Sequence, residues 1–168
     1  MKKNMVLTGL LAAMVCIATS FLQIGIVGGG YVHLGDAIIY LAAALLPTPY
    51  AMAAAAIGAG VADLMVAPMW APFTIVIKML MVLAFTAKRD QLFCWRNALA
   101  ILPAGVVCVA GYYGAEVILL GVSGTPLAVA ATAALAAIPF NGAQAVASGV
   151  CFVVLAVALD RLSIKNRL

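Results

Sequence analysis

Long apolar runs, interrupted at only a few places by glycine, proline or charged residues, make up most of the chain. The runs are continuous and rich in alanine rather than alternating between apolar and polar positions, so they predict helices and not strands. At about 20 residues for each helix that crosses a bilayer, they predict six helices, roughly over residues 5–27, 34–47, 49–66, 71–87, 98–120 and 138–160. Because proline cannot continue a helix, the stretch PTP at 47–49 predicts a tight turn.

The composition indicates what surrounds these helices. The chain has 168 residues, of which 67% are hydrophobic and 8% charged, and its mean hydropathy is +1.23. One soluble core of this size could not bury so much apolar surface, whereas a lipid bilayer can solvate it. Backbone polar groups in lipid must be satisfied within the structure, which a helical bundle does. We therefore predict an all-α integral membrane protein, with residues 1–168 forming a single six-helix domain.

The positive residues orient the predicted bundle, because they fall in three clusters at residues 2–3, 88–96 and 161–167. Basic clusters flank membrane helices on the cytoplasmic side. Both termini and the 88–96 loop are therefore predicted to be cytoplasmic, with an even number of crossings between each pair of clusters. Residues 98–160 have room for two or three crossings, and parity selects two. Residues 121–139 then form a long outer connection with room for a half-helix. The net charge of +4 comes from these three basic clusters and does not indicate a nucleic-acid partner.

The first helix has features of a secretory signal peptide, with a basic start, an apolar stretch and small residues at Ala18 and Ser20. We favour a retained helix, because further spans follow at once. Its small residues recur at four-residue spacing, which lets another helix approach closely; they are Thr8, Ala12, Cys16 and Ser20, with Gly9 and Ala13 alongside.

Enzyme, metal and cofactor chemistry find little support in the sequence. The four cysteines are scattered, without spacing for a metal site or a disulfide framework. The chain contains one histidine, no HExxH or GxSxG motif and no clustered carboxylates, so an intramembrane enzyme is disfavoured. It also lacks a GxxxxGK loop, so it cannot bind ATP through one. We predict no cofactor and no metal.

Polar residues gather near the predicted outer ends of the helices. Charged side chains within a bilayer are costly and usually face the bundle interior or a water-filled cavity. Several of these residues are spaced to share one helix face: His33 with Asp36 and Tyr40, Tyr112 with Glu116, Thr74 with Lys78, and Asn141 with Gln144 and Ser148. We therefore predict a hydrated cup that is open to the outside, with Tyr31, Trp70 and Tyr113 near its rim.

The candidate substrate-binding residues of this cup are His33, Asp36, Tyr40, Asp63, Trp70, Lys78, Tyr112, Glu116, Asn141 and Gln144. A structural role stays open for some of them. Lys78 can pair with Asp63 or Asp36 to hold helices together, Tyr31 and Trp70 can anchor the bundle at the membrane interface, and His33 can be a solvated loop residue.

Three stretches resemble the substrate-specific S components of energy-coupling factor (ECF) vitamin transporters. They are GGGYVHLGDAIIYLAAALLP at 28–47, AIGAGVADLM at 56–65 and WAPFTIVIKMLM at 70–81. The similarity covers most of the chain and includes its length and helix count. It is greatest to the branch that takes riboflavin, pyridoxine or hydroxymethylpyrimidine.

This resemblance implies a prokaryotic plasma-membrane protein that binds a vitamin or precursor from outside. It also implies docking on a transmembrane coupling protein that two ATPase subunits drive. In the family an AxxxA-like motif on the first helix meets that partner. The matching residues are Thr8, Gly9, Ala12, Ala13 and Cys16, which depart from a strict alanine pair.

The identity of the ligand stays open between these vitamins. The predicted cup contains three acidic residues, Asp36, Asp63 and Glu116, and one basic residue, Lys78. This negative charge balance disfavours a strongly anionic ligand. The glycines at 28–30 are expected to hinge a lid that closes over the ligand, with His33 and Asp36 at its base. The alternative function is a self-contained secondary transporter or channel for a small polar metabolite. Such a protein would normally show polar residues through the midplane or an internal repeat, and the sequence shows neither.

Overall fold

The structure is a computed structural model that describes residues 2–25 and 31–167. Helices make up most of it, in the chain order α1 (Lys2–Phe21), α2 (Gly35–Leu45), α3 (Thr48–Val66), α4 (Ala71–Val82), α5 (Trp95–Val122), α6 (Leu127–Ala134), α7 (Ile138–Arg161) and α8 (Ile164–Arg167). Short 3-10 helices precede α4 and α7; they are η1 (Pro68–Trp70) and η2 (Leu135–Ala137).

Prolines mark where several of these helices start. Pro49, Pro72 and Pro139 each lie in the first turn of a helix, where a missing backbone N–H leaves no hydrogen bond unmade. Leu46 is the C-terminal cap of α2 and is followed by Pro47, which caps the start of α3. The predicted tight turn at PTP therefore lies where the two helices meet.

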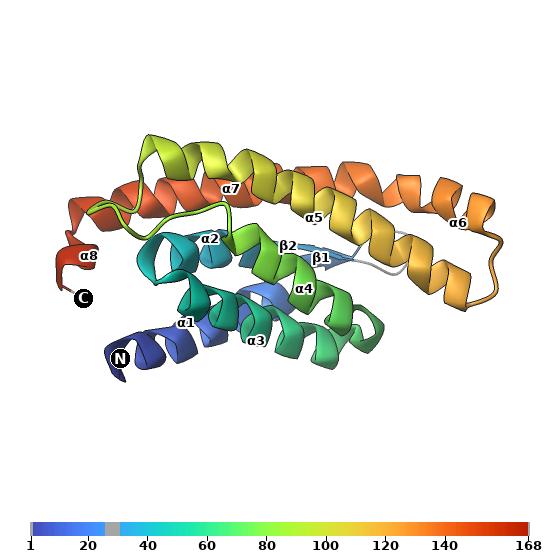
Figure 1. Cartoon of the computed structure of the whole chain (residues 1–168), viewed down its shortest axis with the longest axis horizontal. Helices are drawn as coiled ribbons and strands as arrows, with labels where there is room; N and C mark the ends of the chain where they lie inside the picture. The colour runs from blue at the N-terminus through green and yellow to red at the C-terminus, as the bar shows by residue number, and fades with distance from the viewer. Residues whose placement is uncertain (1, 26–30, 168) are drawn as a thin grey trace.

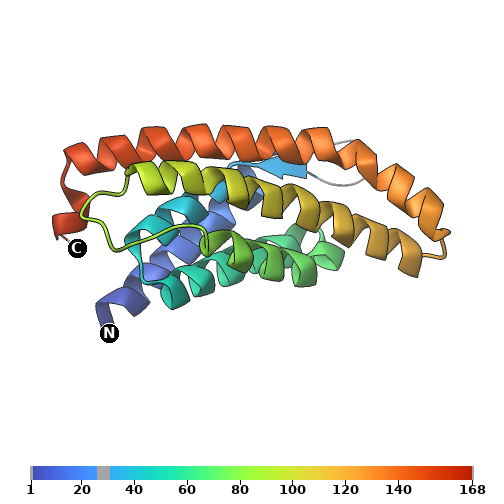
Figure 2. The same cartoon turned by 45° about the horizontal axis from the view of Figure 1, so that its top comes forward.

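The helices pack as a bundle in which neighbours along the chain are mostly neighbours in space. α1 packs on α3, α3 on α4, α4 on α5 and α5 on α7, while α2 lies against α1, α3 and α7. Figures 1 and 2 show α5 and α7 running side by side on one side of the bundle, with α1 and α3 on the other. The buried α2 is therefore enclosed by helices from both halves of the chain.

A short antiparallel hairpin follows α1. Its strands β1 (Gln23–Gly25) and β2 (Tyr31–His33) pair with Gln23 opposite His33 and Gly25 opposite Tyr31. The prediction that the first helix continues to residue 27 is therefore wrong, since α1 ends at Phe21. A short apolar segment such as LQIGIV suits a strand as well as a helix, so composition alone did not place this end. The connection between the strands, residues 26–30, lies outside the described residues.

The loop between α4 and α5 explains a second difference. α4 ends at Val82, earlier than the expected residue 87. The buried Asn97 side chain accepts a hydrogen bond from the backbone N–H of Thr86 and donates to the carbonyl oxygens of Thr86 and Leu92. Asp160 of α7 accepts hydrogen bonds from the backbone N–H groups of Leu92 and Phe93, both at 2.8 Å. Side chains thus satisfy the backbone of this loop in place of helical hydrogen bonds.

The outer connection that was expected at 121–139 is largely helical. It contains α6 and η2, which continue into α7 as one helical stretch, Leu127–Arg161. Within the described residues, four helical stretches are long and apolar enough to cross a membrane; they are Lys2–Phe21, Thr48–Val66, Trp95–Val122 and Leu127–Arg161. Two shorter apolar stretches, Gly35–Leu45 and Pro68–Val82, complete the bundle. The expected six crossings and their orientation stay predictions.

Both chain ends and the α4–α5 loop lie at the same end of the bundle (Figures 1 and 2). The three basic clusters of the sequence therefore face one side. At this end Lys165 of α8 donates hydrogen bonds to the carbonyl oxygens of Ala44 and Ala87, at 2.8 and 2.9 Å. The Ala44 carbonyl belongs to the last turn of α2, where a cation is favourable for the helix dipole.

Candidate functional site

A buried ion pair lies at the centre of the bundle. Asp36 is in the first turn of α2 and Lys78 is in α4, and the Lys78 Nζ atom lies 2.6 Å from Asp36 Oδ1. Neither side chain has any exposed surface. Of the two partners that the sequence left open for Lys78, Asp36 therefore forms the pair. Such a pair is costly to desolvate unless further hydrogen bonds support it.

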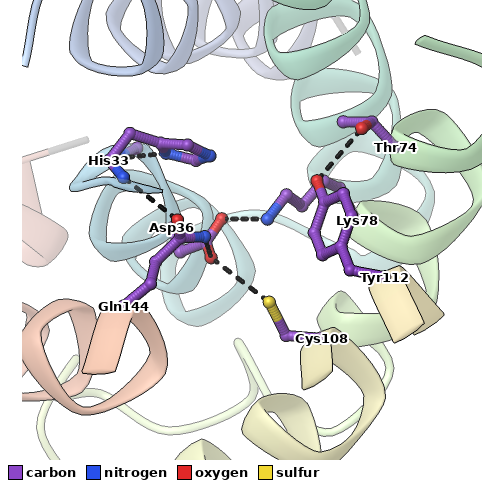
Figure 3. Close-up of polar contacts among 8 residues, drawn as sticks. His33, Asp36, Thr74, Lys78, Cys108, Tyr112 and Gln144 are labelled. Carbon is purple, nitrogen blue, oxygen red and sulfur yellow. Dashed lines mark hydrogen bonds and ion pairs between the residues drawn. The ribbon is translucent and has the colours of Figure 1, made fainter. Parts of the chain in front are cut away.

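Those further contacts come from α5 and α7. The Gln144 amide Nε2 donates a hydrogen bond to Asp36 Oδ2 at 2.8 Å, and the Cys108 thiol donates to the same oxygen at 3.9 Å. Figure 3 shows the side chains converging on Asp36 from three directions. The carboxylate is thus held by a cation, an amide and a thiol, which together offset the loss of its hydration.

Lys78 is supported on its other side by an aromatic ring. Its ammonium lies 5.0 Å from the centre of the Tyr112 ring, within the range of a cation–π interaction. The Tyr112 hydroxyl shares a hydrogen bond of 3.0 Å with Thr74 Oγ1, one turn before Lys78 on α4. Trp70 lies beside the same ring, 6.0 Å from centre to centre. We call the ion pair and the four residues that support it the polar cluster; its members are Asp36, Lys78, Thr74, Cys108, Tyr112 and Gln144.

His33 connects the hairpin to this cluster. Its backbone N–H donates to Gln144 Oε1 at 3.0 Å, and its ring Nδ1 accepts a hydrogen bond from the Gly35 N–H at 3.1 Å. Burial lowers the pKa of the His33 ring from 6.5 to about 4, although the nearby Asp36 carboxylate acts in the opposite direction. His33 lies in β2, so the expected helix face shared with Asp36 and Tyr40 is wrong for this residue, because the hairpin occupies that stretch. A solvated loop position is also excluded, since the side chain is buried.

The α7 residues share one buried face, as their spacing predicts. Asn141, Gln144 and Ser148 are all buried in the bundle. Of the three, Gln144 is the one with a described hydrogen bond to the polar cluster, through Asp36. The Ser148 hydroxyl is enclosed and, within the described part of the chain, has no hydrogen-bond partner.

Tyr40 lies one turn beyond Asp36 on α2, in aromatic surroundings. Its ring stacks on Phe85 at 4.8 Å and meets the edge of Phe152 at 6.0 Å. The side chain is fully buried, and its hydroxyl has no hydrogen-bond partner among the residues that are described. Tyr40 is therefore a core residue that carries a polar atom beneath the ion pair.

Other expected site residues have no described hydrogen bond to the ion pair. Asp63 is buried near the end of α3, and its backbone carbonyl accepts the capping N–H of Ala67. Glu116 is half-buried on α5. Tyr113, expected near the rim, donates through its hydroxyl to the Ala131 carbonyl oxygen of α6 at 3.3 Å. The side chain of Tyr31 and the glycines at 28–30 lie outside what the structure describes.

The expectation of a hydrated cup is wrong at Asp36 and Lys78. Four helices and β2 close around the two side chains and leave them no exposed surface. Cys108 is a member of the site that the sequence analysis did not identify, and its thiol contacts the Asp36 carboxylate. Its position four residues before Tyr112 places both on one face of α5, and this spacing could have identified it.

Comparison with known proteins decides which family the chain belongs to. A family model described as ECF-type riboflavin transporter, S component, matches residues 1–161. The chain belongs to this family. No curated protein matches the sequence.

Family membership settles the general role of this S component. It is a membrane protein and a substrate-binding component of an ECF transporter, not an enzyme. The components of this family bind a vitamin and associate with ECF coupling and ATPase modules. Within the described ranges, no group of three metal-ligating side chains is arranged to hold a metal ion.

The small residues of the first helix of this S component divide between two faces. Thr8 and Ala12 are buried in the bundle, where α1 packs on α3. Gly9 and Ala13 are exposed on the outer face of the helix, and Cys16 is half-buried. Of the five expected docking residues, Gly9 and Ala13 are the most accessible to another protein.

Proposed function

We propose that this S component captures a water-soluble vitamin or vitamin precursor from outside the cell and imports it with an ECF coupling protein and two ATPase subunits. The observation that carries this proposal is the polar cluster. Side chains from α2, α4, α5 and α7 meet there in a bundle that is otherwise almost entirely apolar. Concentrated polar groups in such surroundings are costly for stability, so a functional reason for them is expected.

The charges of the cluster favour a neutral ligand. Asp36 and Lys78 compensate each other, so a strongly charged ligand would disturb a balanced pair. Gln144 and Asn141 can each donate and accept hydrogen bonds, which suits a heterocycle with ring nitrogens and hydroxyl or carbonyl groups. Riboflavin, pyridoxine and hydroxymethylpyrimidine all have this chemistry. Riboflavin is the first probe to use, because the matching family model names it.

The residues on the hairpin side of the ion pair supply surfaces for such a ring. Trp70 and Tyr112 present two aromatic side chains side by side, and aromatic pairs hold flat ligands by offset stacking. Asn141 lies one turn before Gln144 on the same face of α7. We propose that ligand contacts come from these four residues, with Asp36 and Lys78 at the floor of the site.

The hairpin is the proposed entrance. β2 is tied to the cluster by the hydrogen bond from the His33 N–H to Gln144 Oε1. Breaking this bond would loosen the hairpin from α7 and also free the Gln144 amide oxygen, while the amide Nε2 stays bonded to Asp36. Opening of the site and exposure of a ligand-binding group are then one event.

The orientation in the membrane belongs to the same proposal. We place the termini and the α4–α5 loop in the cytoplasm of a prokaryotic cell, because the three basic clusters share one end of the bundle. A single cysteine introduced at exposed Asp90, in a variant without the native cysteines, tests this. Rapid labelling by an impermeant reagent added outside intact cells would contradict the orientation.

Ligand capture is tested on the purified protein. Native mass spectrometry identifies small molecules that co-purify, and titration with riboflavin, pyridoxine and hydroxymethylpyrimidine measures affinity for each. The variant Gln144→Leu should lose binding, whereas Gln91→Leu, at an exposed position in the α4–α5 loop, should bind as the wild type does. If none of the three probes binds and no small molecule co-purifies, the proposed ligand class is wrong.

Transport is tested in liposomes. The protein with its coupling module and ATP should import the bound vitamin, and the protein alone should not. Uptake by the protein alone, driven by a gradient, would instead support a self-contained secondary transporter.

A further inference from the structure

Four buried hydroxyl groups lack a hydrogen-bond partner within the described residues, and two of them, on Tyr40 and Ser148, belong to neighbouring helices of the bundle core. Tyr40 Oη and Ser148 Oγ are both enclosed in side chains without exposed surface, and neither has a hydrogen-bond partner in the ranges that the structure describes. Buried polar atoms in folded proteins nearly always have a partner, either in the protein or in an ordered water molecule. These two hydroxyls therefore point to a group that binds between them.

Helical spacing places Tyr40 and Ser148 at corresponding positions on two neighbouring helices. Tyr40 lies four residues after Asp36 on α2, and Ser148 lies four residues after Gln144 on α7. The two helices pack against each other, and their upper pair is joined by the hydrogen bond from Gln144 Nε2 to Asp36 Oδ2 at 2.8 Å. The lower pair is about 5.4 Å further along each helix, one full turn. Tyr40 and Ser148 thus lie one turn beyond the hydrogen-bonded pair of Asp36 and Gln144, on the same two helices.

Lys78 provides a third polar group beside this contact, because its ammonium is paired with Asp36. Its ammonium carries three N–H bonds and has no hydrogen-bond partner in the described chain apart from the ion pair with Asp36. Tyr40 lies one helical turn beyond Asp36, the partner of Lys78 in the ion pair. One face of the ammonium is turned to Asp36 and another to the ring of Tyr112, which leaves an N–H for a further acceptor.

We propose that Tyr40, Ser148 and Lys78 form a subsite for one neutral hydroxyl group. The two side-chain hydroxyls can each donate or accept a hydrogen bond, while Lys78 only donates. The group between them must therefore both accept and donate, as a hydroxyl does. An anion would be repelled by Asp36 and a cation by Lys78. Phe85 and Phe152 pack against the Tyr40 ring, so the side of the subsite that they cover is apolar.

The hydroxyl can come from a water molecule or from the vitamin. A buried water with three polar partners is well satisfied. A hydroxyl of the ligand would take the same place only if the ligand reaches past the ion pair, and this second source rests on the proposed function. The first source does not, because it concerns the protein without ligand.

A double-mutant cycle separates these sources and tests the subsite. Tyr40→Phe, Ser148→Ala and the double variant are compared with the wild type in a thermal melt without ligand and in a riboflavin titration. If water bridges the two hydroxyls, each single change should lower the melting temperature by about 2–4 °C. The double variant should then fall less than the two single shifts combined, because both changes remove the same bridge.

If the vitamin supplies the hydroxyl, the melts without ligand stay unchanged and the riboflavin affinity falls instead. A fall on the order of tenfold for each single variant, again with less than the combined effect in the double variant, supports this source. Tyr50→Phe is the matched control, since Tyr50 is a half-buried tyrosine at the start of α3, outside the polar cluster. It should match the wild type in both measurements.

The subsite is wrong if the single variants melt at or above the wild-type temperature and bind riboflavin equally tightly. That result is expected if the hydroxyls are truly unpartnered, because replacing an unsatisfied buried hydroxyl by an apolar group is neutral or stabilising. Effects that simply add in the double variant also overturn it. If the wild type binds no riboflavin, the proposed ligand is wrong, while the melts still test the bridging water.

Discussion

A Cβ atom added to Gly58 of α3 would lie 2.5 Å from the carbonyl oxygen of Ala12 in α1. The same atom would lie 2.7 Å from the Cβ atom of Val15. The α1 backbone at Ala12 and the Val15 side chain therefore pack directly on the α3 backbone at Gly58, a close approach that small residues allow in membrane helices. This contact uses the Thr8 and Ala12 face of α1 within the protein itself and leaves the Gly9 and Ala13 face for other partners.

Bulky residues at Ala12 and Ala13 should therefore have different effects. Ala12→Trp inserts a large ring where α1 meets α3, and overpacking of this kind costs typically 1–3 kcal/mol or more of folding free energy. Ala13→Trp adds the same ring on an exposed face, so we expect unchanged melting and ligand affinity with loss of ATP-driven uptake. Melting curves, a riboflavin titration and liposome uptake with the coupling module measure the three properties. Normal uptake by Ala13→Trp would exclude this face as the docking surface.

Removing one partner of the Asp36–Lys78 pair should unfold the protein more easily. Asp36→Asn or Lys78→Met leaves one buried charge uncompensated, which costs about 3–5 kcal/mol. The double variant removes both charges and should recover most of the melting temperature. A ligand titration on the recovered double variant then shows whether the pair also contacts the vitamin. Single variants that melt as the wild type does would mean that water reaches the pair, as the sequence had suggested.

The Gln144 side chain should control the hairpin. Replacing it with leucine removes the acceptor of the His33 N–H and the amide donor to Asp36. Hydrogen exchange of the His33 amide should therefore become faster, by on the order of tenfold for the loss of a bond that contributes about 1.4 kcal/mol. Asn141→Leu, on the same face of α7 and without a described bond to the hairpin, is the control and should leave this amide protected. Equal protection in both variants would show that other contacts hold β2.

The single histidine gives a pH prediction with a definite sign. Because burial lowers the pKa of His33 to about 4, the folded protein favours the neutral ring. Its contribution to stability is complete above the ordinary value of 6.5 and is lost as the pH falls through 6.5 toward 4. Nitrogen-15 NMR of histidine-labelled protein, purified without a histidine tag, should show the neutral Nε2–H form, because Nδ1 accepts the Gly35 N–H. A titration midpoint near 6.5 would show that the ring is hydrated.

Helix positions followed from the sequence wherever proline marks a boundary. The predicted segment 49–66 matches α3 (Thr48–Val66), and 138–160 matches α7 (Ile138–Arg161). The ends of α1 and α4 did not follow, because apolar residues continue past the end of each helix. Leu22 leads into a strand, and Leu83 leads into a loop held by Asn97 and Asp160. A run of apolar residues indicates that a segment is buried in protein or lipid, but it does not indicate which backbone conformation the segment has.

The candidate site was predictable in its chemistry and less so in its geometry. A lysine within an apolar run needs an anionic partner, so the sequence limited Lys78 to the two acids nearest its depth in the membrane. The choice of Asp36 depends on how α2 and α4 pack, which no spacing within one helix can show. The role of Gln144 as a bridge to β2 depended on a hairpin that the sequence did not predict. Asp160 and Lys165 bind backbone groups of distant segments, and Asn97 binds those of the loop before it; no motif marks either role.

The unequal lengths of the helices have a consequence for the surrounding lipid. The stretch Leu127–Arg161 has 35 residues, or about 50 Å of helix, against a hydrocarbon core of about 30 Å. The segment between Glu116 and Asp160 carries no charged side chain, so its outer end is poorly suited to stand in water. α2, with 11 residues, is only about 16 Å long. The long stretch therefore has a positive hydrophobic mismatch, which tilting of the helix or local thickening of the bilayer accommodates, whereas α2 is shielded from lipid by the helices around it, so its short length needs no such adjustment.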